Sequence, residues 1–240
     1  MKEQLPLAVR LRAASTFDSF EVGENGALLS ALMAGASTAR LPPLWLWSGS
    51  GQGRSHLLQA TCSRATQAGR RACYLPLAES WPQPEMLAGL DALEVVCVDD
   101  IQMVLGQAPW ERALFRLYND VLEQGHQLVI SASAAPANLP IALPDLASRL
   151  AACVIWQIKP LNDVEQGNAL SARARVLGIE WSEDTLQYLQ RRLPRDMTSL
   201  FKALEQLDAA ALSHQRKLTV PFVRSVLETW VGSSADKQSP

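Results

Sequence analysis

The chain has 240 residues, of which 48% are hydrophobic and 19% are charged. This composition is sufficient for a sizeable core and excludes a globally disordered protein. The net charge of −2 argues against a protein that coats nucleic acid, although it leaves room for a local basic patch. No apolar run reaches the length of a membrane span, and charges interrupt the first residues, where a signal peptide needs an apolar stretch. We therefore expect a cytoplasmic protein.

The cysteines and histidines are dispersed along the chain, and none of their spacings is typical of a zinc site. We expect the thiols to be buried or incidental side chains in a reducing compartment. The four cysteines are Cys62, Cys73, Cys97 and Cys153.

Residues 1–14 form an arm ahead of the first expected domain, and they contain the run Gln4-Leu5-Pro6-Leu7. An amide side chain offers directional hydrogen bonds, and leucines fill an apolar pocket. A proline reduces the entropy that a peptide loses when it orders on a partner. The run has the character of a docking peptide, but runs this short also arise by chance.

Five short apolar runs, separated by helical patterns, predict five buried strands. Their apolar residues are continuous, which is typical of a parallel sheet covered on both faces. The clearest helix between them covers 109–123, with one apolar face and Gly125 at its end. The predicted strands are 44–47, 72–75, 94–98, 127–131 and 154–158.

The character of the sequence changes after Pro160. Asn162 and Glu165 form a capping signature for a helix, and further helical patterns follow without a strand signal. We expect an α/β domain over residues 15–159, a small all-helical domain over 160–231, and a loose polar tail over 232–240.

A glycine-rich run, SGSGQGRS at 48–55, follows the first predicted strand and opens a helix, which is the context of a phosphate-binding loop. Gly49, Gly51 and Gly53 let backbone N–H groups turn inward around phosphate oxygens, and the helix N-terminus adds a favourable dipole. The Ser55 hydroxyl can bind Mg²⁺. Taken alone, the run is also compatible with an ordinary Gly/Ser turn.

Two positions of this loop depart from the usual pattern. Ser48 stands where the first glycine is expected, and Arg54 stands where a lysine is expected. Arginine keeps the positive charge but is a wider, planar donor. We therefore expect nucleotide binding and only weak hydrolysis by the chain itself.

Two acids, Asp99 and Asp100, end the third predicted strand. The carboxyl ends of strands are where open α/β sheets bind ligands. In phosphate-loop NTPases one such carboxylate supports Mg²⁺ and the next can orient an attacking water. A solvated turn after the strand is the alternative for the acids alone, but loop and acids in this order reinforce each other.

The order of these motifs resembles the DnaA/Hda branch of the AAA+ family, over nearly the whole chain. The resemblance rests on GSGQGRSHLLQA, VVCVDDIQ, LVISASAAP and LPDLASRL, on the helical region after them, and on the segment TFDSFEVGENGALLSAL before them. Arg54 is similar to the Hda members of the branch, since DnaA carries a lysine. The resemblance implies an AAA+ P-loop NTPase fold with a five-stranded parallel sheet and a helical lid.

The resemblance also implies a role for each matching residue. Ser133 falls at the sensor-one position, where DnaA has an aspartate, and Arg195 falls at the sensor-two position; both would contact nucleotide. Arg149 matches the arginine finger, which acts on ATP held by a neighbouring molecule. The loop and strand residues keep the roles given above: Gly49, Gly51, Gly53, Arg54 and Ser55 for phosphate, Ser55 and Asp99 for Mg²⁺, and Asp100 for water. The run Gln4 to Leu7 resembles a sliding-clamp-binding peptide.

The two arginines have weaker signals of their own. Read without the family, Arg149 is typical of a solvated surface group. Arg195 lies near the expected start of a helix, where a cation is unfavourable for the helix dipole, and this placement favours an anionic partner.

The resemblance implies a regulator that binds ADP or ATP with Mg²⁺, docks on the DNA polymerase III β sliding clamp, and presents Arg149 to ATP on DnaA. Such a protein limits initiation of replication, contacts DNA indirectly through the clamp, and works at the replisome; self-association is open. One alternative is an autonomous AAA+ ATPase of helicase-loader type, favoured by Asp100 and opposed by Arg54 and Ser133. Another is a DNA-binding initiator fragment, opposed by the net charge and by the expectation that no DNA-binding domain follows the lid.

Overall fold

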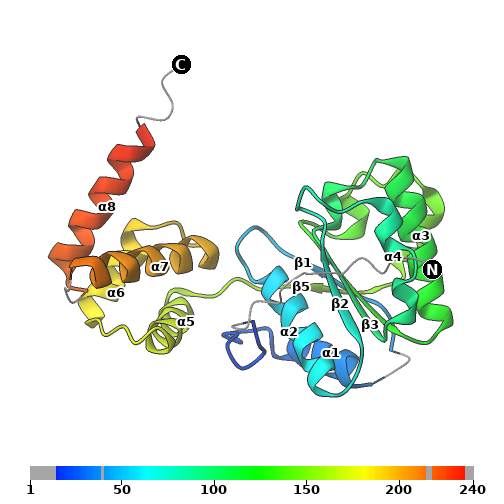
Figure 1. Cartoon of the computed structure of the whole chain (residues 1–240), viewed down its shortest axis with the longest axis horizontal. Coiled ribbons are helices and arrows are strands. Elements are labelled where there is room, and N and C mark those ends of the chain that lie inside the picture. Colours follow the sequence, from blue (N-terminus) through cyan, green and yellow to red (C-terminus); the bar gives the residue numbers. More distant parts are fainter. Residues whose placement is uncertain (1–14, 39–40, 215–217, 236–240) are drawn as a thin grey trace. The chain divides into compact units, whose positions relative to one another are not determined.

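The computed structural model describes residues 15–38, 41–214 and 218–235 (Figure 1). The chain divides into two compact units, Met1–Pro160 and Leu161–Pro240, and each is described by itself.

The first unit is built on a sheet of five parallel strands in the order β2-β3-β4-β1-β5. Each predicted strand is present within one residue at either end, so the predicted parallel sheet is confirmed. Because all strands run the same way, the loops that follow them meet at one edge of the sheet. The strands are β1 (Leu44–Trp47), β2 (Ala72–Pro76), β3 (Val95–Asp99), β4 (Gln127–Ala132) and β5 (Val154–Gln157).

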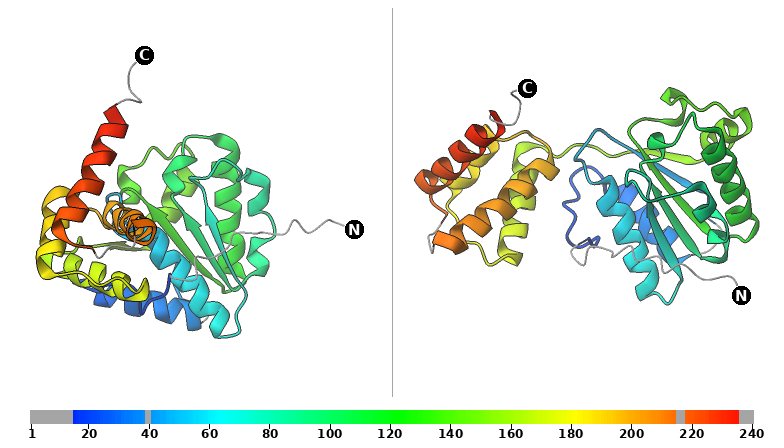
Figure 2. Two further views of the ribbon diagram at one scale, coloured as in Figure 1. Left: turned by 60° about the vertical axis from the view of Figure 1, so that its left-hand side comes forward. Right: turned by 45° about the horizontal axis from the view of Figure 1, so that its top comes forward.

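Helices cover both faces of this sheet (Figures 1 and 2). Alternate strand residues point to opposite faces: Val95 and Cys97 belong to the core under α1 and α2, whereas Val96 and Val98 belong to the core under α3 and α4. The covering helices are α1 (Gly26–Ser37), α2 (Arg54–Gln67), α3 (Ala108–Glu123) and α4 (Pro144–Ala151).

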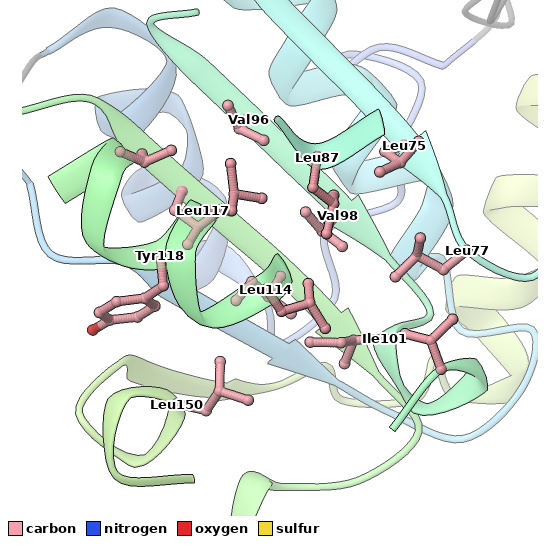
Figure 3. Close-up of a cluster of buried hydrophobic side chains, with 14 of the residues drawn as sticks. Leu75, Leu77, Leu87, Val96, Val98, Ile101, Leu114, Leu117, Tyr118 and Leu150 are labelled. Carbon is pink, nitrogen blue, oxygen red and sulfur yellow. The ribbon is translucent and has the colours of Figure 1, made fainter. Parts of the chain in front are cut away.

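The core under α3 and α4 consists mainly of aliphatic side chains. Leu114 and Leu117 of α3, Leu150 of α4 and Val96 and Val98 of β3 belong to one cluster of buried side chains (Figure 3). Short 3₁₀ helices complete the connections on this side: η1 (Pro84–Leu87), η2 (Leu90–Ala92), η3 (Ile101–Met103) and η4 (Pro136–Asn138).

Strand β5 departs from the prediction of continuous burial. Val154 is 40% and Ile155 is 44% exposed, because β5 lies at the edge of the sheet and pairs, among the described strands, with β1 alone. Of the tryptophans on the strands, Trp45 is fully buried, and Trp47 and Trp156 are partly buried.

The second unit contains four helices among its described residues, in agreement with the predicted helical lid. Asn162 caps the first of them: its side chain accepts from Glu165 N, and the Glu165 side chain accepts from Asn162 N, as the capping signature predicts. Leu170, Leu186 and Leu204 lie in its core. The helices are α5 (Asp163–Val176), α6 (Glu183–Arg192), α7 (Met197–His214) and α8 (Val220–Ala235).

All four thiols are free and buried. Burial raises the pKa of Cys73 and Cys153 to about 12, so these thiols stay protonated and unreactive. Within the described residues no three or more His, Cys, Asp and Glu side chains gather in a potential metal site. The described helices are all too short or too polar to cross a membrane.

Candidate phosphate-binding site and its surroundings

The glycine-rich loop joins the carboxyl end of β1 to the start of α2. Gly51 (φ 71°) and Gly53 (φ 94°) adopt the left-handed conformation, which glycine enters without steric penalty. A Cβ atom on Gly53 would also lie 2.7 Å from Cε2 of Phe20. The loop conformation therefore requires glycine at both positions, while Gly49 is exposed in an ordinary conformation.

Arg54 begins α2, and its guanidinium folds back over the loop. It donates to the carbonyl oxygens of Ser48 and Gly49, the latter at 3.1 Å, and to Oδ1 of Asp100 at 2.8 Å. The Arg54 side chain is only 13% exposed, so water screens this ion pair less than it screens a surface pair.

One hydrogen-bond donor of Arg54 has no acceptor among the described residues. Its Nε atom is buried and has no hydrogen-bond partner in the described part of the chain, which is unusual for a buried polar group. A phosphate oxygen beside the loop would satisfy this donor with a charge-assisted hydrogen bond. The loop, the helix N-terminus and this donor together fit a nucleotide phosphate.

Asp100 follows β3 in the left-handed conformation (φ 56°), which costs a residue other than glycine about 1–3 kcal/mol. Three contacts hold it there. Its N–H donates to Oγ of Ser131 at 3.0 Å, and its Oδ1 accepts from Arg54 and from Nε2 of Gln102. Asp100 therefore neutralises Arg54 in this structure through its Oδ1 atom.

Asp99 is the last residue of β3 and is buried. Its Oδ1 accepts from the Ser131 hydroxyl, and its Oδ2 accepts from the Tyr74 hydroxyl at 2.7 Å. Burial, followed by the charge of Asp99, raises the pKa of Tyr74 well above its usual value, so the phenol stays protonated and donates. The Tyr74 hydroxyl thereby connects β2 to the end of β3.

We refer to Arg54, Asp99, Asp100, Ser131 and Tyr74 as the loop cluster. Sequence reasoning missed Ser131 and Tyr74, because both lie inside apolar runs that read as ordinary buried strands. The signal was the strand register: Val98 pairs with Ile130, which places Asp99 beside Ser131.

The predicted sensor-one residue, Ser133, follows β4. Its backbone N–H donates to Oε1 of Gln102 at 3.1 Å, and Gln102 in turn donates to Asp100. Ser133 is thus connected to the loop cluster by its backbone and through Gln102, whereas Ser131 enters the cluster with its hydroxyl.

The segment before α1 packs against the start of α2. The rings of Phe20 and His56 lie 5.6 Å apart between centroids, and Nε2 of His56 is 2.8 Å from the carbonyl oxygen of Thr16. This segment therefore borders the glycine-rich loop.

Arg149 lies in the last turn of α4 and is exposed. Leu146 and Leu150 of the same helix are buried in the core, so one face of α4 is anchored while Arg149 is open to solvent. Within the described residues Arg149 forms no ion pair, and it makes no hydrogen bond to the loop cluster.

Arg195 belongs to the helical unit, and its side chain is 76% exposed. Nη1 of Arg195 lies 3.5 Å from Oδ1 of Asp163, a weak pair at this exposure. Helix α7 begins at Met197, after Asp196, whose side chain accepts from Ser199 N. Arg195 therefore lies just before the start of this helix, as expected, and Asp196 accepts from the first turn.

The predicted clamp-binding residues Gln4, Leu5, Pro6 and Leu7 lie outside the described residues.

Two family models match parts of the chain. The bacterial DnaA ATPase domain matches residues 84–157, and the lid domain of Hda matches residues 163–227.

Solved structures share the fold at low sequence identity. Domain III of the replication initiation protein DnaA from Thermotoga maritima has a TM-score of 0.80 and 20% identity, covering 91% of this chain and 97% of that one. AMPPCP-bound DnaA from Aquifex aeolicus has a TM-score of 0.71 and 17% identity, covering 82% of this chain and 65% of that one. The Thermotoga maritima RuvB branch migration motor has a TM-score of 0.70 and 16% identity, covering 91% of this chain and 72% of that one.

A parallel five-stranded sheet, a glycine-rich loop after β1, acids at the end of β3 and a helical lid define an AAA+ P-loop NTPase fold. Both family models come from one branch of this class, and together they match segments in both units. The chain is a DnaA/Hda-type AAA+ protein and is related to proteins of DNA replication.

Proposed function

We propose that the chain binds ADP or ATP with Mg²⁺, docks on the β sliding clamp, and stimulates hydrolysis of ATP bound to DnaA. It would thereby act as a negative regulator of replication initiation. The observation that carries this proposal is the contrast between its two key arginines. Arg54 is buried and paired inside its own site, whereas Arg149 is exposed, without an ion pair among the described residues, on a helix that the core anchors.

The nucleotide site follows from the glycine-rich loop. Backbone N–H groups of the loop and the guanidinium of Arg54 would hold the phosphates, with the unsatisfied Nε as one donor. Ser55 would bind Mg²⁺, and Asp99 would support it from the end of β3. Bound Mg²⁺ would neutralise phosphate charge. Two solved DnaA structures of the same fold have AMPPCP bound.

The action on DnaA follows from the exposed arginine. A guanidinium placed against a neighbour's γ-phosphate stabilises the charge that develops as the phosphoryl group is transferred. Hydrolysis would then occur in the site of DnaA, and this chain would supply one catalytic residue, Arg149, to it. The clamp, held through Gln4 to Leu7, would raise the local concentration of the chain at DNA.

An autonomous ATPase of helicase-loader type is the alternative. The position of Asp100 after β3 favours it, whereas the pairing of Asp100 Oδ1 with Arg54 and Gln102 counts against it. Rapid turnover of free ATP by the isolated chain would favour this alternative.

The proposal is tested by following DnaA-bound ATP with and without the chain, and with and without clamp loaded on DNA. We expect the chain to accelerate hydrolysis when the loaded clamp is present, and to accelerate it weakly or not at all without clamp. Equal hydrolysis in all four conditions would contradict the proposal.

A further inference from the structure

Glu111, in the first turn of α3, is a buried carboxylate that the loop cluster does not use. Its side chain is almost inaccessible to solvent, at 1% exposure. A carboxylate in such a place is unfavourable unless its oxygens accept hydrogen bonds.

Three backbone N–H groups satisfy this carboxylate. Oε1 accepts from Gly106 at 2.7 Å and from Ala142 at 3.0 Å, and Oε2 accepts from Leu143 at 2.6 Å. Burial alone would raise the pKa of Glu111, but the hydrogen bonds outweigh it and the pKa lies below its usual value. Glu111 is therefore ionised at neutral pH, and both of its oxygens are engaged.

These contacts join the start of α3 to the segment before α4, which is far from it in the sequence. Gly106 belongs to the turn between η3 and α3, whereas Ala142 and Leu143 directly precede α4. Leu143 is the N-cap residue of α4, and no side chain caps this helix in the usual way. Glu111 supplies the missing acceptor from a neighbouring helix, and its negative charge lies at the favourable end of the α4 dipole.

Helix α4 depends on such anchors, because its eight residues are too few for a stable isolated helix. Leu146 and Leu150 fix one face of it against the core. Glu111 fixes where it begins. The position of Arg149, in the last turn, follows from these two constraints.

We propose that Glu111 is a positioning residue for Arg149: by holding the backbone of Ala142 and Leu143, it sets the place from which the guanidinium reaches a partner's nucleotide. This inference rests on the proposed action on DnaA. Displacing a group by about 1 Å can cost on the order of 100-fold in rate, so loosening the start of α4 should lower catalysis more than binding.

The test compares Glu111→Ala and Glu111→Gln with Val121→Ala. Val121 is fully buried on the same helix, so its truncation weakens the core but leaves the carboxylate in place. Glutamine keeps one acceptor oxygen and the size of the side chain. The readouts are amide hydrogen exchange at Ala142 and Leu143, thermal melting, and the stimulated DnaA hydrolysis as a function of chain concentration.

We expect faster exchange at both amides in Glu111→Ala, and a maximal stimulated rate at least about 10-fold lower with an unchanged half-saturating concentration. Glu111→Gln should lie between wild type and alanine, and Val121→Ala should keep the maximal rate. If Glu111→Ala does not fold, the glutamine variant still decides, because its maximal rate must fall.

Three results would overturn the inference. Unchanged stimulation by either folded Glu111 variant would show that the carboxylate is structural only, while the role of Arg149 would stand. An equal fall in Val121→Ala would attribute the effect to general destabilisation. A wild-type chain without any stimulation would remove both this inference and the proposed function.

Discussion

Two arginines of the α/β unit differ in burial and in pairing. Arg54, in the glycine-rich loop, donates to two carbonyl groups and to Asp100, and its side chain is 13% exposed. Arg149, on α4, is exposed and forms no ion pair within the described residues. A guanidinium that is already paired inside its own chain is a binding element of that chain, whereas an open one on an anchored helix is available to another molecule.

The supports of the two arginines differ as well. Arg54 sits in the loop cluster, where Asp99, Asp100 and Ser131 hold one another through hydrogen bonds at the edge of the sheet. Arg149 relies on the helix that carries it, through the core contacts of Leu146 and Leu150. Changes in the loop cluster should therefore alter the chain's own nucleotide affinity and its stability. Changes at Arg149 should alter only the hydrolysis reaction in the partner.

The largest effect is expected for Arg149→Ala. Arginine fingers of GTPases contribute roughly 10³–10⁵ in rate, so stimulation of DnaA-bound ATP hydrolysis should be lost. Arg149→Lys should restore little, because an ammonium group cannot reproduce the planar fork. Melting temperature, nucleotide affinity and clamp binding, measured on the same preparation, should match the wild type.

A general loss of stability in Arg149→Ala would instead identify a structural role for the arginine. Full stimulation by the variant would remove it from the mechanism while leaving the fold unaffected.

The next largest effect is expected for Gln4→Ala combined with Leu5→Ala. Interface side chains that matter most are worth about 2 kcal/mol or more each, so the double variant should lose detectable clamp binding. Its nucleotide affinity should stay unchanged, since neither residue belongs to the loop cluster. Co-migration of the variant with the clamp in gel filtration would show that binding resides elsewhere.

A smaller effect is expected for Arg54→Ala. Losing a charge-assisted phosphate contact should weaken ADP binding by about 1.5–3 kcal/mol, or roughly 10- to 150-fold. Arg64→Ala, on the exposed face of the same helix, removes a cation without touching the loop and serves as the control. Calorimetry that finds equal ADP affinity for both variants would exclude Arg54 from the site.

The smallest effect is expected for Tyr74→Phe. The change removes one hydrogen bond to the buried Asp99 but leaves that of Ser131, so the free energy of unfolding should fall by about 1.5 kcal/mol. Denaturant titration measures it. An unchanged midpoint would mean that Asp99 does not need the phenol, and the link between β2 and the end of β3 would lose its support.

The sheet could be predicted well from the sequence, because β1 to β4 are short continuous apolar runs between helices. Few folds other than a covered parallel sheet are compatible with this pattern. Less could be predicted about the edge strand β5, since an apolar run does not state how many neighbours a strand has. The capping residue Asn162 was also recognisable, because its partner Glu165 lies in the same helical turn.

The candidate site was harder to predict where it depends on contacts between strands. The glycines, Arg54 and the acids were visible as local motifs, but the Arg54–Asp100 pair joins α2 to the end of β3. Ser131 and Glu111 are single polar residues in apolar surroundings, and only the folded arrangement shows which groups they serve.

The measurement that tests the central claim most directly asks which molecule's ATP is hydrolysed. DnaA is loaded with radiolabelled ATP, the chain is supplied with unlabelled nucleotide, and both are combined with DNA-loaded clamp in a single turnover. If Arg149 works on a partner, the label on DnaA converts to ADP with the wild-type chain and stays ATP with Arg149→Ala. If the label stays ATP with the wild-type chain while the unlabelled ATP is consumed, the chain is an ATPase in its own right and the account is contradicted.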